Sequence, residues 1–170
     1  MRRIGWQLPL TVALGVLAWF AIGPQVAAIP ALYVAAVAPE LSRIDLTHHR
    51  LPNRLVVPGL VVGLLAAAGS WATTGVFPLV SLVAGVGYAG VLFLFALAGG
   101  MGMGDVKLAA VLGLASPTAL IAIASPMFAF LLGGVVALVV LIVRGRGTRI
   151  PFGPFLLAGY AGALLLEAVR

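Results

Sequence analysis

The stretch SPMFAFLLGGVVALVVLIV at residues 125–143 contains no charged residue and is as long as a membrane-spanning helix. The hydrocarbon core of a bilayer is about 30 Å thick, and an α-helix needs roughly 20 residues to cross it. A helix also satisfies its own backbone hydrogen bonds, which lipid cannot do for it. We therefore predict an all-α, polytopic transmembrane helical bundle. Similar apolar runs fill most of the remaining chain, at residues 6–22, 25–42, 55–74, 77–98, 106–123 and 152–169.

The overall composition agrees with a membrane protein. Of the 170 residues, 63% are hydrophobic and 8% are charged, whereas soluble domains carry about 25% charged residues. So few polar side chains cannot cover the surface of a water-soluble globule. At roughly 20 residues per span, the chain holds about seven helices, in a range of about six to eight. This number fills the sequence, so we expect a single integral membrane domain over residues 1–170.

Short turn signals separate some of the apolar runs. Gly23-Pro24 divides the first two runs, Thr73-Thr74-Gly75 divides the third and fourth, and Ser125-Pro126 divides the fifth and sixth. Glycine and proline at such points mark turns. We predict that each of these pairs of runs forms a helical hairpin.

The positive charge is placed in a way that predicts the orientation of the bundle. The net charge is +6, and the ten basic residues lie in short clusters between apolar runs. Cytoplasmic loops of membrane proteins are enriched in Lys and Arg. With seven spans and a cytoplasmic N-terminus, only Arg170 falls outside, so the charge indicates lipid rather than nucleic acid as the partner. The basic residues on the predicted cytoplasmic side are Arg2, Arg3, Arg43, Arg50, Arg54, Lys107, Arg144, Arg146 and Arg149.

The N-terminal residues allow a second interpretation. Met1-Arg2-Arg3 followed by an apolar run also fits a signal peptide. Whether residues 1–24 form a retained helix or a cleaved signal stays open. Cleavage would leave the rest of the predicted topology unchanged.

Acidic residues are rare in this chain, which makes their positions informative. The four are Glu40, Asp45, Asp105 and Glu167, and both aspartates fall at predicted cytoplasmic helix ends. Ionisable groups at membrane depth are costly and mark function. The chain has no cysteine, which excludes disulfides, thiolate nucleophiles and zinc sites built on cysteine.

Each aspartate also has an ordinary structural explanation. Asp105 follows a glycine-rich stretch and comes just before the apolar run that starts at Val106, where it would serve as a helix N-cap. Asp45 lies in a polar segment that is typical of a loop, and Pro52 would begin the next helix. His48-His49 in this loop lack a third ligand, so we expect no metal ion.

Taken together, the two aspartates suggest a chemical role. Two carboxylates held close to one another share a proton, because both cannot ionise easily. One then acts as a general base on water and the other as a general acid toward a scissile peptide bond. This chemistry needs no metal or other cofactor. Other intramembrane protease chemistries are excluded, because the sequence has no His-Glu-x-x-His motif and neither histidine lies within a predicted span.

Three ordered motifs carry a resemblance to a known family. They are Leu51-Pro52-Asn53 after Asp45, Gly102-Met-Gly-Asp105-Val-Lys107, and Ile150-Pro-Phe-Gly153-Pro154-Phe-Leu156. Together they resemble the type IV prepilin peptidase family of Gly-x-Gly-Asp aspartyl proteases. The resemblance implies that Asp45 and Asp105 are the catalytic pair. It also implies supporting roles for Gly102, Gly104, Lys107, Pro52, Asn53, Gly153 and Pro154.

The resemblance further implies a substrate and a location. Family members remove a short basic leader from prepilin-like precursors (pilins, pseudopilins or Flp-type pilins) whose apolar stem lies in the membrane. They act at the cytoplasmic face of the bacterial cytoplasmic membrane. Longer members carry a Cys-x-x-Cys segment and also N-methylate the product. Because this chain has no cysteine, it is similar to the short, peptidase-only members.

Two other functions and one packing question stay open on the sequence alone. A small transporter would use paired membrane acids as a proton relay, but it predicts acids near mid-membrane and internal repeats. A non-catalytic assembly subunit of a pilus or secretion machine would have the same fold. The small-residue pair Gly59 and Gly63 favours close packing within the bundle over a dimer face, and the oligomeric state is undetermined.

Overall fold

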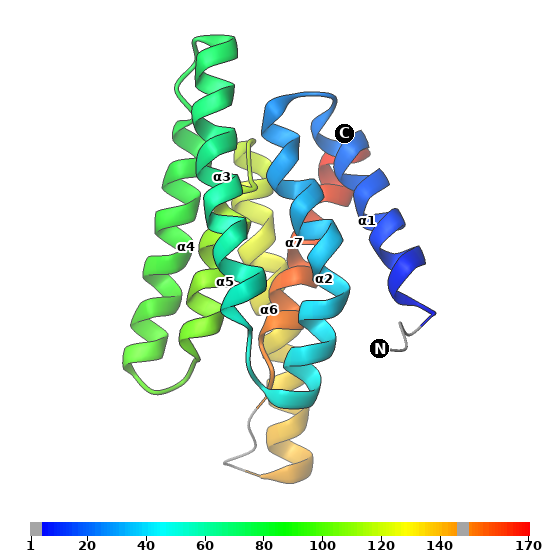
Figure 1. The fold of residues 1–170 in the computed structure, drawn as a ribbon. Coiled ribbons are helices and arrows are strands. Elements are labelled where there is room, and N and C mark those ends of the chain that lie inside the picture. The colour runs from blue at the N-terminus through cyan, green and yellow to red at the C-terminus, as the bar shows by residue number, and fades with distance from the viewer. Residues whose placement is uncertain (1–4, 146–149) are drawn as a thin grey trace.

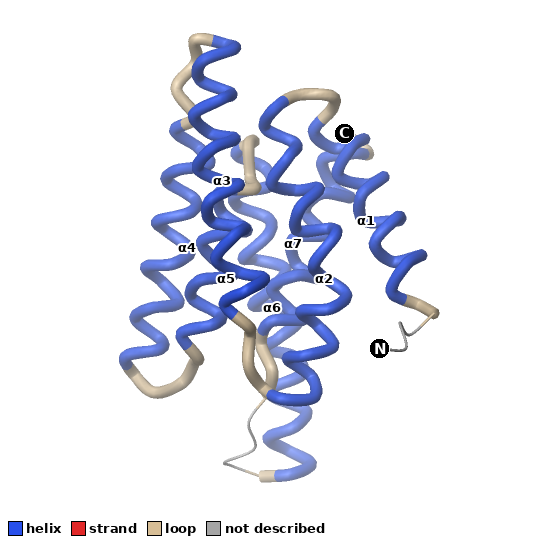
Figure 2. The backbone as a smooth tube through the Cα atoms, in the orientation of Figure 1, coloured by secondary structure: helices blue, strands red, loops and turns tan. Residues whose placement is uncertain are grey.

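The computed structural model describes residues 5–145 and 150–170, and the regular elements in this part of the chain are all helices joined by loops (Figures 1 and 2). It forms seven α-helices and one short 3₁₀ helix, with no strand among the described residues. The predicted all-α fold and the predicted number of helices are confirmed. The elements are α1 (Gln7–Ile22), η1 (Val26–Ala28), α2 (Ile29–His48), α3 (Asn53–Thr74), α4 (Leu79–Leu97), α5 (Met103–Leu114), α6 (Ala119–Arg144) and α7 (Gly153–Ala168).

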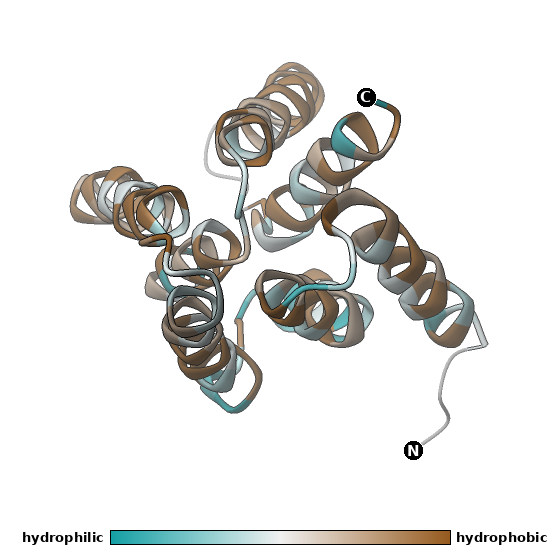
Figure 3. Ribbon diagram, turned by 90° about the horizontal axis from the view of Figure 1, so that it is seen from above, coloured by the Kyte–Doolittle hydropathy of each residue, from teal (hydrophilic) through white to brown (hydrophobic). Residues whose placement is uncertain are grey.

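The helices run alternately up and down, so their connections gather at two ends (Figure 1). The lower end in Figure 1 holds the ends of α2, α4 and α6 and the starts of α3, α5 and α7. Viewed along the bundle, the ribbons are mostly hydrophobic on all sides (Figure 3). Four segments are long and apolar enough to cross a membrane: Val26–His48, Asn53–Thr74, Leu79–Leu97 and Ala119–Val143.

The charge pattern can be followed in part on this fold. Arg50, Arg54 and Lys107 lie at the lower end of the bundle, whereas Arg170 follows α7 at the opposite end. The alternating direction of the helices therefore separates these charges as the sequence predicts. The predicted cytoplasmic residues Arg2, Arg3, Arg146 and Arg149 lie outside the described residues.

The boundary between α5 and α6 differs from the prediction. The predicted turn at Ser125-Pro126 is wrong: α5 ends at Leu114, α6 begins at Ala119, and Pro126 lies inside α6. Thr118 caps the start of α6, because its side chain accepts a hydrogen bond from the Ile121 N–H at 3.3 Å. The turn between the fifth and sixth helices therefore lies closer to the N-terminus than the sequence predicts.

Pro126 is accommodated within α6 by a side chain from another helix. A proline has no N–H, so the carbonyl four residues earlier loses its helical donor. That carbonyl belongs to Ala122, and it accepts a hydrogen bond from the Tyr88 hydroxyl of α4. The helix continues through Pro126 because the freed acceptor is satisfied.

Helix α5 is short and lies inside the bundle. Its 12 residues give a length of about 18 Å, which is too short to cross a membrane core of about 30 Å. It packs against both α3 and α4, which make little contact with each other. The predicted hairpin of the third and fourth runs is therefore wrong as a packed pair, although Gly75 does end α3 with a φ of 71°. By contrast, α1 and α2 pack together as predicted.

Glycines allow α5 to approach its neighbours closely. A Cβ on Gly113 would clash with the Ala84 carbonyl oxygen of α4. On the other side, Cβ atoms on Gly59 and Gly63 of α3 would lie within 3.0 Å of the Val111 and Leu114 side chains. The predicted use of Gly59 and Gly63 for packing within the bundle is confirmed.

Candidate active site

Asp45 lies in the last turn of α2, and its side chain is only 4% exposed. The prediction that it occupies a loop is wrong, because α2 continues to His48 and ends at His49, which has a φ of 53°. Asp45 Oδ2 accepts a hydrogen bond from the backbone N–H of Gly153 at 3.0 Å. Gly153 is the first residue of α7, where a helix leaves its N–H groups free for other acceptors.

A glycine is required at position 153 by this contact. A Cβ there would lie 2.8 Å from Asp45 Oδ2 and 3.3 Å from Leu51 Cδ2. Any larger residue would push against the carboxylate that the N–H binds. Pro154 follows in the first turn of α7, where the missing N–H of proline costs no hydrogen bond.

Asp105 lies in the first turn of α5, three residues after the N-cap residue Gly102. The N-cap role considered for Asp105 is therefore wrong in position, although its Oδ2 accepts a hydrogen bond from the Gly102 N–H at 3.4 Å. Its other oxygen, Oδ1, is buried and accepts no hydrogen bond from the described residues. Unpaired buried polar atoms are rare in proteins, and one of the explanations for them is a catalytic role.

The two aspartates are linked by packing and by charge. Leu51 packs on Gly153 next to Asp45, and its Cβ lies 3.0 Å from the position that a Cβ on Gly104 would take. Burial is the largest cause that raises the pKa of Asp105 to about 6, and the charge of Asp45 raises this pKa further, while the Gly102 N–H opposes both. The two carboxyl groups therefore interact electrostatically at one end of the bundle.

The supporting residues join the same region to α3. Lys107 Nζ donates a hydrogen bond to Asn53 Oδ1 at 3.0 Å, which connects α5 to the start of α3. Pro52 precedes α3, and its carbonyl accepts a hydrogen bond from the Leu55 N–H at 3.0 Å. The residues from all three sequence motifs thus lie at the lower end, around the two aspartates (Figure 1).

The other two acids are engaged elsewhere. Glu40 forms an ion pair with Arg43 at 2.6 Å and accepts a hydrogen bond from Gln7 at 3.0 Å. Glu167, near the opposite end, accepts a hydrogen bond from Thr118 Oγ1 at 3.2 Å. Within residues 5–145 and 150–170 no three His, Cys, Asp or Glu side chains gather as a metal site would require.

Two features of the site had no clear signal in the sequence. The Gly153 N–H that binds Asp45 is a backbone group, so residue identity alone does not reveal it. Leu51 belongs to one of the three motifs, but nothing in the sequence shows that it fills the space between Gly104 and Gly153. The first role depends on how α7 docks against α2, and the second depends also on how α5 packs beside Leu51.

Fold and site together define a multi-pass helical membrane protein with a pair of interacting aspartates at one end. Its sequence matches the Type IV leader peptidase family over residues 30–143, and the chain belongs to this family. The matched region contains both aspartates and ends before α7.

A curated relative extends the comparison over nearly the whole chain. The Prepilin leader peptidase/N-methyltransferase of Pseudomonas putida is 36% identical over 181 aligned residues, which cover 96% of this chain and 60% of the relative. The chain thus spans about 60% of the length of that relative. No solved structure matches the protein.

Proposed function

We propose that the protein is a membrane-embedded aspartic endopeptidase that removes the leader peptide from prepilin-like precursors. The observation that carries the proposal is the pairing of Asp45 with Asp105. One carboxyl group is buried and bound by the Gly153 N–H, and the other has a buried oxygen without a hydrogen-bond partner among the described residues. Family membership and the Pseudomonas putida relative support the substrate class.

The surroundings of the two carboxyl groups favour different roles. Each carboxyl group accepts one backbone N–H, and the bond from Gly153 to Asp45, at 3.0 Å, is shorter than the bond from Gly102 to Asp105, at 3.4 Å. On this difference Asp45 is assigned as the general base that takes a proton from water. Because its pKa is raised to about 6, Asp105 holds a proton up to a higher pH than an ordinary aspartate does. Asp105 is therefore assigned as the general acid that protonates the leaving amine. No metal, nucleophilic side chain or cofactor enters this scheme.

The proposed location follows from charge and topology. The basic residues Arg50, Arg54 and Lys107 share the lower end with the aspartates, and such clusters favour the cytoplasmic side. The leader would then be cut at the cytoplasmic face of a bacterial cytoplasmic membrane. The transporter alternative predicted acids near mid-membrane, whereas both aspartates lie at helix ends.

The chain is further proposed to cleave without methylating its product. The sequence contains no cysteine, and the cysteine-containing segment of longer family members is therefore missing from it. A trimmed precursor that gains a methyl group when this chain is the only added enzyme would refute this point.

Co-expression with candidate precursors tests the proposed activity, with leader loss read by mass spectrometry. Asp45→Asn and Asp105→Asn should each lower cleavage by about 10²- to 10⁴-fold, since each removes a proton-transfer group. The double variant should lose little more than either single variant, because the pair acts as a unit. Glu167→Gln is the matched control and should cleave normally. Near-normal processing by either aspartate variant would end the proposal.

A further inference from the structure

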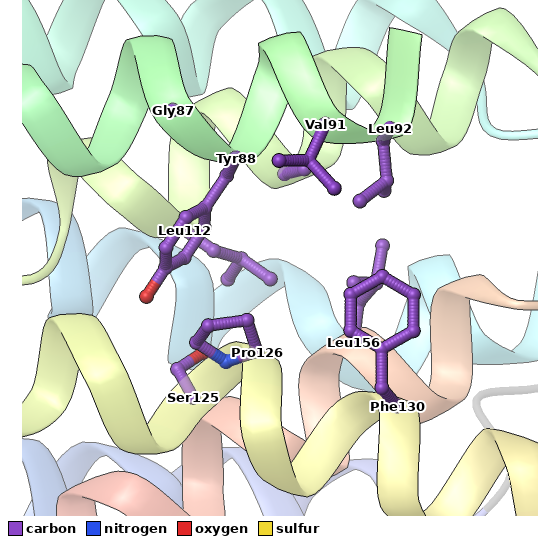
Figure 4. Close-up of a pocket in the computed structure, with 10 residues that line it drawn as sticks. Gly87, Tyr88, Val91, Leu92, Leu112, Ser125, Pro126, Phe130 and Leu156 are labelled. Carbon is purple, nitrogen blue, oxygen red and sulfur yellow. The ribbon is translucent and has the colours of Figure 1, made fainter. Parts of the chain in front are cut away.

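An apolar pocket of about 180 Å³ lies between α4 and α6, with α5 and α7 forming its floor (Figure 4). Aromatic and aliphatic side chains from four helices point into it. Its single phenolic hydroxyl, on Tyr88, is already bound to the Ala122 carbonyl. The side chains that define the pocket include Tyr88, Val91, Leu112, Pro126, Phe130 and Leu156.

The pocket lies on the same helix faces as the aspartate site. Ala109 and Leu112 line it from α5, four and seven positions after Asp105, and this spacing places all three residues on one face of a helix. Leu156 lines it from α7, three positions after Gly153, which binds Asp45. The pocket and the aspartate site therefore share one face of α5 and one face of α7.

The distance between the site and the pocket fits a short stretch of peptide. Four to seven residues of α-helix correspond to about 6–10 Å. An extended chain advances about 3.3 Å per residue, so it would cover this distance in about two or three residues. The pocket lies on the side of the aspartates that leads away from the lower end and into the apolar part of the bundle.

The mouth and the size of the pocket suit an apolar side chain that arrives from the membrane. Gly87 and Val91, which border it on α4, are exposed on the outer surface of the bundle. Apolar cavities of about 150 Å³ bind benzene. A pocket of about 180 Å³ therefore has room for an aromatic or branched aliphatic side chain.

We infer that this pocket binds a large apolar side chain from the membrane stem of the substrate, two or three residues beyond the scissile bond. The inference rests on the proposed peptidase function and adds a specificity site to it. The side chain enters between α4 and α6, while the adjoining peptide bond lies at Asp45 and Asp105.

Two glycines of α4 provide a matched test. A Cβ on Gly87 or on Gly90 meets no other atom within 4 Å, and both residues are exposed, but only Gly87 borders the pocket. Two precursors would be compared that differ only in carrying Phe or Ala at the second and third positions after the cleavage site. The measured quantity is the ratio of kcat/KM for the Phe precursor to that for the Ala precursor.

Gly87→Leu should lower this ratio about tenfold, since hydrophobic pockets discriminate by about that factor or more for small changes in size. Gly90→Leu should leave the ratio unchanged. Leu112→Ala enlarges the pocket, so this variant should cleave a Trp precursor better, relative to the Phe precursor, than the parent protein does. This second measurement tests the inference even if Gly87→Leu does not insert into the membrane.

The possible failures are distinct from one another. An unchanged ratio in Gly87→Leu and in Leu112→Ala, with cleavage otherwise intact, would overturn the inference alone and would leave a lipid acyl chain as the occupant. Failure of the parent protein to cleave any precursor faster than Asp45→Asn would overturn the proposed function and this inference with it.

Discussion

Lys107 Nζ donates a hydrogen bond to Asn53 Oδ1 across 3.0 Å, and this contact joins the two sequence segments that contain the aspartates. Asn53 is the first residue of α3 and ends the motif that follows Asp45, and Lys107 lies two residues after Asp105. The contact therefore fixes the start of α5 against the start of α3. We expect it to influence the spacing of the two carboxyl groups, although it touches neither of them.

Removal of this contact should loosen the site. Asn53→Leu and Lys107→Met should each lower cleavage, and their effects should not add, because both remove the same bond. The coupling in a double-mutant cycle should be about 0.5–1 kcal/mol, since the pair is exposed to solvent. Asn53→Asp keeps an acceptor for Lys107 and should retain most activity. Additive losses would show that the two side chains act separately.

Gly153→Ala should damage the site while leaving the bundle folded. The added methyl would lie 2.8 Å from Asp45 Oδ2, so the carboxylate or the start of α7 must shift. We expect a loss of cleavage of at least about tenfold, which corresponds to about 1.4 kcal/mol in the barrier. Gly134→Ala of α6 is the control, because its methyl would meet no atom within 4 Å. Equal activity of both variants would contradict the assigned role of Gly153.

The pH dependence of cleavage should report the protonation of Asp105. With a pKa of about 6, Asp105 holds its proton below that pH and loses it above. If it is the general acid, kcat/KM should fall toward alkaline pH with a midpoint near this value. A profile in reconstituted membranes that stays level up to pH 8 would contradict the assignment.

The free energy of unfolding should also depend on the protonation of Asp105, and the direction of this dependence on pH is fixed. The pKa of Asp105 in the folded protein lies above its ordinary value of 3.8, so the folded state binds more protons between these two pH values. The free energy of unfolding should therefore decrease as pH rises from about 4 to about 6. Asp105→Asn should remove this part of the slope, which thermal unfolding in detergent at several pH values can measure.

Tyr88 should stabilise α6 through the carbonyl that Pro126 leaves free. Tyr88→Phe removes the donor to Ala122 and should cost about 1–3 kcal/mol, the penalty for a buried unpaired acceptor. Pro126→Ala restores a helical N–H, so the cost of Tyr88→Phe should shrink in that background. Tyr33→Phe is the control, because its acceptor Leu55 keeps a helical donor. Equal costs in both backgrounds would refute this account.

The orientation of the bundle can be tested with two threonines at opposite ends. Thr47 and Thr74 are both exposed, and they lie near the ends of α2 and α3. In this cysteine-free chain, a membrane-impermeant thiol reagent added to intact cells should label Thr74→Cys. It should label Thr47→Cys only after permeabilisation. The reverse pattern would place the aspartates outside the cell.

The sequence predicted the positions of the helices more reliably than it predicted which helices pack against each other. The motifs around Asp45, Asp105 and Gly153 were grouped by their resemblance to one family, and the structure places all three segments at one end of the bundle. The Asp45–Gly153 hydrogen bond spans 108 positions and follows from helix docking, which no local pattern encodes. The turn was misplaced because Ser125-Pro126 resembles a break when the compensating Tyr88 is not considered.

Some of the missed structure did have a sequence signal. Thr118 after Pro117 is a typical N-cap residue, and it marks the true start of α6. The insertion of α5 between α3 and α4 had a weaker signal in the small residues Ala84, Gly85 and Gly113, which permit the close approach. Small residues are so common in this chain that their pattern alone did not identify the partner helix.

The binding of Asp45 by the first residue of α7 has a consequence for biogenesis. A ribosome adds about 5–20 residues per second, so the 108 positions from Asp45 to Gly153 take about 5–20 s to synthesise. During that interval α2 and α5 are both synthesised before the N–H that holds Asp45 exists. The order of synthesis thus delays completion of the site until the last helix docks, and a half-made chain carries both carboxyl groups without their final geometry.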